Sequence, residues 1–193
     1  MKIIETGLKG VYIADPEVHR DSRGYFMESF RFDVWEEVLG PVCFIQENES
    51  SSVKGVLRGL HYQVSPHGQS KLIRAVYGAV RDVVVDMRPK SVTFGQVHVE
   101  ILDDIKKRQL FVPKGFAHGF LTLSSQAIVQ YKVDAPYVAK AERTIRFDDD
   151  TLRIDWGVPS EISSLSVKDR YGLSWLEAVN NLSTDGQTGL NNS

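Results

Sequence analysis

The sequence predicts a mainly β protein that folds as a sandwich or barrel, most economically a jelly roll, with one short helix near each end. Short apolar runs alternate with clusters of Gly, Pro, Asn, Asp and Ser along most of the chain. These runs are rich in β-branched and aromatic residues, which favour strands. Only two segments carry a helical pattern. Many short strands with few helices are typical of barrels that hold a ligand in their mouth.

The first helix is predicted over residues 33–39. Asp33 is expected to cap it, and Glu36, three residues on, completes the pattern of a capping box. Gly40 is expected to end the helix. The apolar stripe consists of Val34, Trp35, Val38 and Leu39.

Strands are predicted through the middle of the chain, over residues 72–77, 79–87, 96–101, 109–112 and 128–133. Gly78 is expected to form a tight turn or kink between the first two. In the third, Val97, Val99 and Ile101 alternate with polar residues, which is the pattern of a half-buried strand. His98 is therefore expected to face outward.

A second helix is predicted over residues 174–182, and it closes a single domain that spans residues 1–182. Residues 183–193 are polar and rich in glycine, with almost nothing to bury. Such a segment is expected to be a flexible tail.

Composition narrows the function classes. The formal net charge is −2, the pI is about 6.2 and no basic stripe occurs, so nucleic-acid binding has no electrostatic support. No signal peptide and no apolar run long enough for a membrane span is found, so the cytoplasm is the expected compartment.

Cys43 is the only cysteine, which excludes an internal disulfide or a thiolate metal cluster. It is expected to be a small buried hydrophobe.

Two glycine-punctuated runs place polar side chains among apolar neighbours. Residues 55–63 read Gly-Val-Leu-Arg-Gly-Leu-His-Tyr-Gln, and residues 113–120 read Pro-Lys-Gly-Phe-Ala-His-Gly-Phe. Polar groups in such surroundings are costly to bury, which points to one shared pocket. Strict alternation would put Arg58 and His61 on opposite faces of a strand. We expect a β-bulge at Gly59 to bring them to the same face.

Six blocks of the sequence resemble the dTDP-4-dehydrorhamnose 3,5-epimerase family, in that family's order and spacing. The blocks are Asp21-Ser-Arg-Gly-Tyr-Phe-Met-Glu28, Gln46-Glu-Asn48, residues 55–63, residues 113–120, Tyr131-Lys132 and Leu165-Ser-Val-Lys-Asp169. The resemblance implies a cupin-type jelly roll and a homodimer with sites shared across the interface. It also implies that no metal or other cofactor is used.

The implied reaction is epimerisation at C3 and C5 of a dTDP-4-keto-6-deoxyhexose, from dTDP-4-dehydro-6-deoxyglucose to dTDP-4-dehydro-L-rhamnose. Inverting a carbon beside a ketone requires a base, a partner for the enolate oxygen and an acid on the opposite face. His61 suits the base, because an imidazole titrates near neutral pH. The resemblance assigns Asp169 to orient it, Lys71 to face the ketone oxygen and Tyr131 to be the acid.

The remaining matches to the family are substrate-binding positions. Arg23 suits the diphosphate, and Phe26 and Tyr137 suit stacking on thymine. The other matched positions are Glu28, Gln46, Asn48, Arg58, Asp82, His118, Glu142 and Lys168.

Three alternatives stay open. Some family relatives invert only one carbon. A metal-dependent cupin enzyme is suggested by the run ending in His118, although Tyr62 and Gln63 follow His61 where paired histidines would be needed. A non-catalytic sugar-nucleotide binder would keep the fold without the chemistry.

Overall fold

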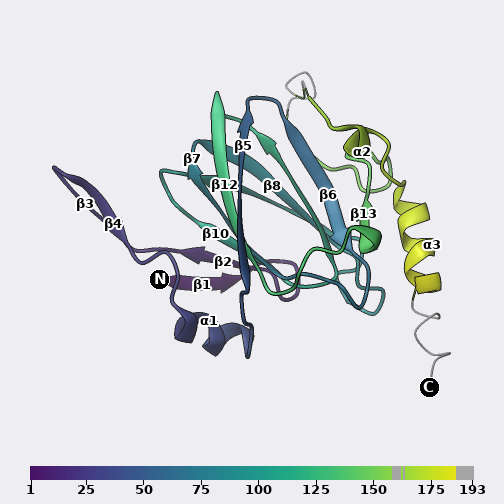
Figure 1. The fold of residues 1–193 in the computed structure, drawn as a ribbon, viewed down its shortest axis with the longest axis horizontal. Coiled ribbons are helices and arrows are strands. Elements are labelled where there is room, and N and C mark those ends of the chain that lie inside the picture. Colours follow the sequence, from purple (N-terminus) through teal and green to yellow (C-terminus); the bar gives the residue numbers. More distant parts are fainter. Residues whose placement is uncertain (158–161, 163, 186–193) are drawn as a thin grey trace.

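Two antiparallel sheets face each other across a common core (Figure 1). The computed structural model describes residues 1–157, 162 and 164–185. The six-stranded sheet has the order β1-β2-β10-β7-β12-β5, and the five-stranded sheet has the order β13-β6-β11-β8-β9. This is a cupin-like jelly roll, which confirms the predicted fold class.

The strands of the six-stranded sheet are β1 (Lys2–Glu5), β2 (Tyr12–Asp15), β5 (Gln46–Val53), β7 (Lys71–Tyr77), β10 (Gln109–Val112) and β12 (Gln126–Val133). Those of the five-stranded sheet are β6 (Leu57–Gln63), β8 (Ala79–Asp86), β9 (Val97–Asp103), β11 (Phe116–Thr122) and β13 (Glu142–Thr144). A separate hairpin consists of β3 (Val18–Asp21) and β4 (Gly24–Met27). The helices are α1 (Phe32–Leu39), η1 (Ala139–Ala141), α2 (Val167–Arg170) and α3 (Trp175–Asp185).

Apolar side chains fill three layers. Ile73, Leu110 and Val129 belong to the core between the sheets. A second core covers the outer face of the five-stranded sheet, where Trp156 and other residues of the C-terminal segment pack. Trp35 of α1 packs against the outer face of the six-stranded sheet. Between the sheets the apolar core stops short of one end, which leaves room for a pocket.

Gly78 makes the predicted turn between β7 and β8. Its φ is +69°, and a Cβ there would lie 2.1 Å from the carbonyl oxygen of Gln126. Because β7 and β8 belong to different sheets, this turn carries the chain from one sheet to the other.

The capping box predicted for the first helix is wrong. The cap of α1 is Arg31, which makes no side-chain capping bond, and Asp33 lies in the first turn, where it accepts a hydrogen bond from Arg31 Nε at 2.9 Å. Asp33 therefore pairs with a charged neighbour instead of a backbone N–H. Gly40 ends the helix as predicted, with its N–H donating to Glu36 O. Val38, assigned to the buried stripe, is exposed.

His98 does not face outward. It pairs with Val84 in the β8–β9 ladder, and Val84 belongs to the core between the sheets. The alternate residues Val97 and Val99 pack into the outer core instead. Both faces of β9 are therefore covered by protein. The alternation correctly separates an apolar face from a polar face, but the polar face is not turned to solvent.

Two other expectations fail. Cys43 is exposed, because it lies in the connection between α1 and β5 that packs through its neighbour Phe44. The predicted tail does not begin at Ser183, since α3 continues to Asp185. The rest of that tail, residues 186–193, lies outside the described residues.

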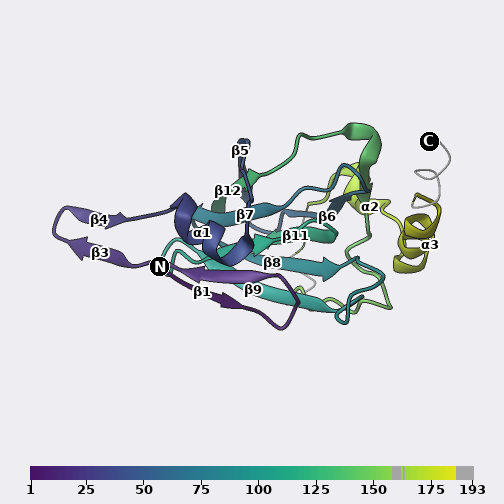
Figure 2. The same cartoon turned by 90° about the horizontal axis from the view of Figure 1, so that it is seen from below.

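The β3–β4 hairpin extends away from both sheets (Figure 2). Tyr25 and Phe26 on this hairpin are 53% and 73% exposed. None of the helices in the described part of the chain has the length and apolar character that a membrane span requires.

Candidate active site

A cavity of about 520 Å³ opens between the two sheets. One wall comes from the six-stranded sheet through β5, β7 and β12, and the facing wall comes from the five-stranded sheet through β6 and β11. The one-turn helix α2 adds to the rim. The lining includes Gln46, Asn48, Arg58, His61, Lys71, His118, Tyr131, Tyr137, Glu142, Lys168 and Asp169. Each of these is a residue that the sequence assigned to the site.

The expected bulge at Gly59 is confirmed. His118 pairs with His61 and Phe120 pairs with Arg58, so three steps along β6 match two along β11. Gly59 has φ +126°, and a Cβ there would lie 2.4 Å from Gly119 Cα. Only glycine fits this close approach of two backbones. The extra residue brings Arg58 and His61 to the same cavity.

His61 is paired with Asp169 from α2. The distance from His61 Nε2 to Asp169 Oδ1 is 2.5 Å, and Ser166 Oγ donates to Asp169 Oδ2 at 2.7 Å. Burial alone would raise the pKa of the Asp169 carboxyl, but the hydrogen bonds from His61 and Ser166 hold it below its usual value. An ionised Asp169 fixes the proton on Nε2 and leaves the lone pair of His61 on Nδ1.

Lys71, the first residue of β7, supplies positive charge to the same cavity. Burial lowers the pKa of its ammonium to about 8, and the nearby carboxylates of Asp82 and Glu142 oppose that fall. Lys71 therefore stays largely protonated at neutral pH. A cation in such surroundings stabilises negative charge that develops on a bound ligand.

Behind the cavity wall, His118 Nε2 lies 3.0 and 2.9 Å from the two carboxylate oxygens of Asp82 on β8. Both side chains are buried. Burial lowers the pKa of His118, against the opposing charge of Asp82. Asp82 does not line the cavity, unlike the other predicted residues of the barrel; it holds His118 from behind.

Tyr131 stands on the opposite sheet from His61. It pairs with Asn48 of β5 and Ile73 of β7, and it lines the cavity with Asn48. Burial raises the pKa of the Tyr131 phenol, and the charge of Arg58 partly offsets the rise. The phenol therefore carries its proton at neutral pH and can act as an acid.

A polar cluster closes the rim. Lys168 Nζ lies 2.9 Å from both carboxylate oxygens of Glu142, and Tyr137 Oη donates to Glu142 Oε2 at 3.1 Å. Burial alone would raise the pKa of the Glu142 carboxyl, but the hydrogen bond and the charge of Lys168 keep it below its usual value. Tyr137 is 55% exposed, so its side chain is accessible to a ligand.

Three predicted residues lie away from this cavity. Arg23 and Phe26 are on the exposed β3–β4 hairpin, and Glu28 follows it, 3.7 Å from Arg31. The Arg23 guanidinium binds its neighbour Asp21. The structure of one chain does not bring these side chains together with His61.

The sequence reasoning missed Ser50, Gln69 and Ser166, which also line the cavity. Ser166 had a detectable signal, because serine followed three residues later by aspartate is a helix-capping pattern. Ser166 is indeed the cap of α2, and its hydroxyl accepts from the N–H of Asp169. Ser50 and Gln69 lie in polar stretches that gave no such signal.

The fold and the pocket define a class: a cupin-like jelly-roll enzyme of the acid–base type, with an imidazole and a phenol on facing sheets. The family model described as dTDP-4-dehydrorhamnose 3,5-epimerase matches residues 5–177. The chain belongs to this family.

Individual relatives agree with the family match. The chain is 46% identical over 179 residues to a dTDP-4-dehydrorhamnose 3,5-epimerase of Shigella flexneri, covering 92% of this chain and 98% of that one. It is 37% identical over 179 residues to a dTDP-4-dehydrorhamnose 3-epimerase of Streptomyces niveus, covering 92% and 86%. The crystal structure of an epimerase from Legionella pneumophila in complex with dTDP-4-keto-L-rhamnose matches with a TM-score of 0.83 and 46% identity, covering 87% of this chain and 89% of that one.

Proposed function

We propose that this protein epimerises C3 and C5 of a dTDP-4-keto-6-deoxyhexose, converting dTDP-4-dehydro-6-deoxyglucose to dTDP-4-dehydro-L-rhamnose. One observation carries the proposal: His61, oriented by Asp169, and Tyr131 line one cavity from opposite sheets. A ring bound between them has a base on one face and an acid on the other. Inversion of a carbon beside a ketone needs that arrangement.

In the proposed mechanism, His61 Nδ1 removes the proton from the carbon beside the ketone. The electron pair of that C–H bond moves to form an enolate, whose oxygen is stabilised by the Lys71 ammonium. Tyr131 then delivers its proton to the opposite face of the same carbon. Solvent restores the proton on Tyr131 and takes the one from His61. A second round at the other carbon completes the reaction.

The test uses dTDP-4-keto-6-deoxyglucose in deuterated water, with no added metal or nicotinamide. We expect deuterium at C3 and C5 together with inversion at both carbons. A protein that binds the sugar nucleotide but washes in no label would be a binder, and the proposal would be wrong.

A single-carbon epimerase is the second candidate, because the Streptomyces niveus relative is named a 3-epimerase. The same experiment separates the two, since label at only one carbon supports the second candidate. The tilt of the sugar ring between His61 and Tyr131 would decide which carbon inverts.

Metal independence and the cytoplasmic compartment stay predictions. Among the described residues, no three His, Cys, Asp or Glu side chains converge as a cation site. Elemental analysis of the purified protein tests the first prediction, because a stoichiometric transition metal would favour the metal-dependent alternative.

We also propose a homodimer in which the β3–β4 hairpin of one protomer reaches the cavity of its partner. The exposure of Phe26 and of Arg23, whose side chain is 88% exposed, supports this. An Arg23→Ala/Phe26→Ala variant is expected to be weakly active. Refolding it together with His61→Ala should restore one complete site per mixed dimer. If each hairpin serves its own subunit, the mixture will gain no activity.

A further inference from the structure

The loop that carries Tyr137 is held by a buried amide from the strand that carries His61. Gln63 is the last residue of β6 and is 9% exposed. It lies two residues after His61, on the same face of the strand, and lines a small recess together with His61 and Tyr137. Gln63 has no part in the proposed chemistry.

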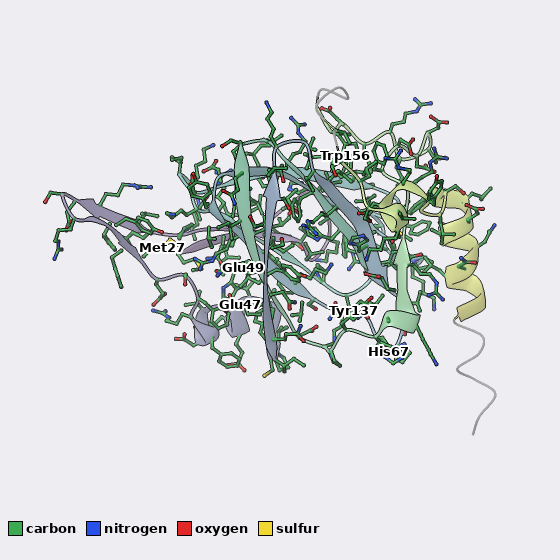
Figure 3. All side chains as sticks on the ribbon, turned by 45° about the horizontal axis from the view of Figure 1, so that its top comes forward. Met27, Glu47, Glu49, His67, Tyr137 and Trp156 are labelled. Atoms are coloured by element: carbon green, nitrogen blue, oxygen red, sulfur yellow. The ribbon has the colours of Figure 1, made fainter. Side chains whose placement is uncertain are left out.

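The Gln63 amide binds the peptide groups immediately before and after Tyr137. Its Oε1 accepts from the backbone N–H of Val138 at 2.6 Å, and its Nε2 donates to Pro136 O at 3.3 Å. The same Nε2 donates to His67 O at 2.8 Å, on the loop that leads to β7. Figure 3 shows Tyr137 and His67 at the same end of the molecule.

Packing alone does not hold the Tyr137 side chain, because the residue is more than half exposed. Its hydroxyl donates to Glu142 Oε2 at 3.1 Å, which fixes one end of the side chain. The position of the ring therefore depends on the backbone of residues 136–138. Gln63 is the side chain that binds this backbone on both sides of Tyr137.

We propose that Gln63 is a positioning residue that fixes Tyr137 for stacking on the nucleobase and so sets the affinity for the nucleotide part of the substrate. This inference rests on the proposed function, with its dTDP-linked substrate, and on the expectation from the family resemblance that Tyr137 stacks on thymine. It couples the strand of the catalytic base to the site that recognises the nucleotide. Preorganising an aromatic platform reduces the ordering cost of binding.

The test compares Gln63→Met, which keeps the length of the side chain but removes both polar atoms, with Gln126→Met on the exposed start of β12 as a matched control. We expect Gln63→Met to weaken dTDP binding and raise KM by about 5- to 20-fold, the scale of one or two lost hydrogen bonds. The value of kcat should stay within about twofold of the wild-type value, and the pH profile of kcat should be unchanged. Calorimetric titration with dTDP and steady-state kinetics measure these quantities.

Two further readouts separate positioning from a general loss of structure. Amide hydrogen exchange at Val138 should accelerate in Gln63→Met, because its acceptor is gone. In a double-mutant cycle with Tyr137→Ala, the two losses in dTDP affinity should not add. If Gln63→Met does not fold, Gln63→Glu removes the donor to Pro136 and is expected to show the same split between KM and kcat.

The inference is overturned if Gln63→Met binds dTDP as tightly as the wild type, if kcat falls while affinity is unchanged, or if the two losses add. A failure of this inference is distinguishable from a failure of the proposed function. If the proposed function is wrong, the wild-type protein itself will show no dTDP binding or no deuterium wash-in.

Discussion

Two histidines on neighbouring strands of the five-stranded sheet are each paired with an aspartate, and the two pairs differ in burial and in the origin of the carboxylate. The His61 side chain is 23% exposed, and its partner Asp169 comes from α2, near the end of the chain. The His118 side chain is 9% exposed, and its partner Asp82 lies on the adjacent strand β8 with no exposure. Although His61 and His118 pair directly in the sheet, they have different surroundings.

The difference indicates a division of labour. A general base must reach its substrate and exchange protons with solvent, and His61 meets both conditions. The buried pair gives up that access. Asp82 instead supplies fixed negative charge close to Lys71 and a hydrogen bond that holds His118 in the cavity wall.

Removal of the accessible histidine is expected to have the largest effect on activity. His61→Ala should lower kcat by about 10³-fold or more and abolish deuterium wash-in at both carbons, because a positioned base contributes about 10² to 10⁴ in rate. Steady-state kinetics and NMR of the sugar measure both effects. His67→Ala, an exposed histidine at the same end of the molecule, is the control. If His61→Ala still exchanges deuterium into the sugar at the wild-type rate, another group is the base.

Removal of the buried histidine is expected to lower the stability of the protein more than His61→Ala does. His118→Ala leaves the Asp82 carboxylate buried without its donor and should lower the free energy of unfolding by about 3–5 kcal/mol. His61→Ala leaves Asp169 bonded to Ser166 and should cost less than about 2 kcal/mol. Urea unfolding measures both, and His118→Gln, which can still donate, should recover part of the loss. Equal losses for the two alanine variants would remove the distinction between the pairs.

The smallest expected effect concerns pH. Activity should fall as pH rises through about 8, where Lys71 loses its proton. The Asp82 charge raises the pKa of Lys71, so Asp82→Asn should lower that pKa further and move the alkaline limb of kcat/KM, which reports the free enzyme, to lower pH. A one-unit change corresponds to a loss of about tenfold on that limb. Glu49→Gln, on the outer side of β5 (Figure 3), is the control for a lost carboxylate. An unmoved limb would show that another group titrates there.

The sequence predicted the strands that are rich in apolar residues. Runs of β-branched and aromatic residues bounded by turn residues located β7, β8, β10 and β12, and alternation located β9. A glycine among polar residues located the bulge at Gly59. Strand β5 gave no pattern, because one of its faces lines the polar cavity and the other is exposed to solvent. The error at His98 has a different cause: both faces of β9 are covered, so the polar face with His98 and Glu100 is also turned inward.

Most of the predicted site residues do meet in one cavity, but their assignment to a common site came from the resemblance to a family. Periodicity could not reveal that Asp169 would reach His61 across 108 residues of chain. Nor could it reveal the role of Gln63, which depends on a loop that folds back after β12. Arg23, Phe26 and Glu28 lie on or just after a hairpin that the single chain leaves exposed, and they come to the site only in the proposed homodimer.

The central claim is that acid and base act on opposite faces of the bound sugar. The most direct test follows deuterium incorporation and stereochemistry together in the Tyr131→Phe variant, with dTDP-4-keto-6-deoxyglucose in deuterated water. The account predicts that His61 still removes protons, so label enters with the original configuration retained while inversion falls by about 10²-fold or more. Inversion by Tyr131→Phe at the wild-type rate would contradict it.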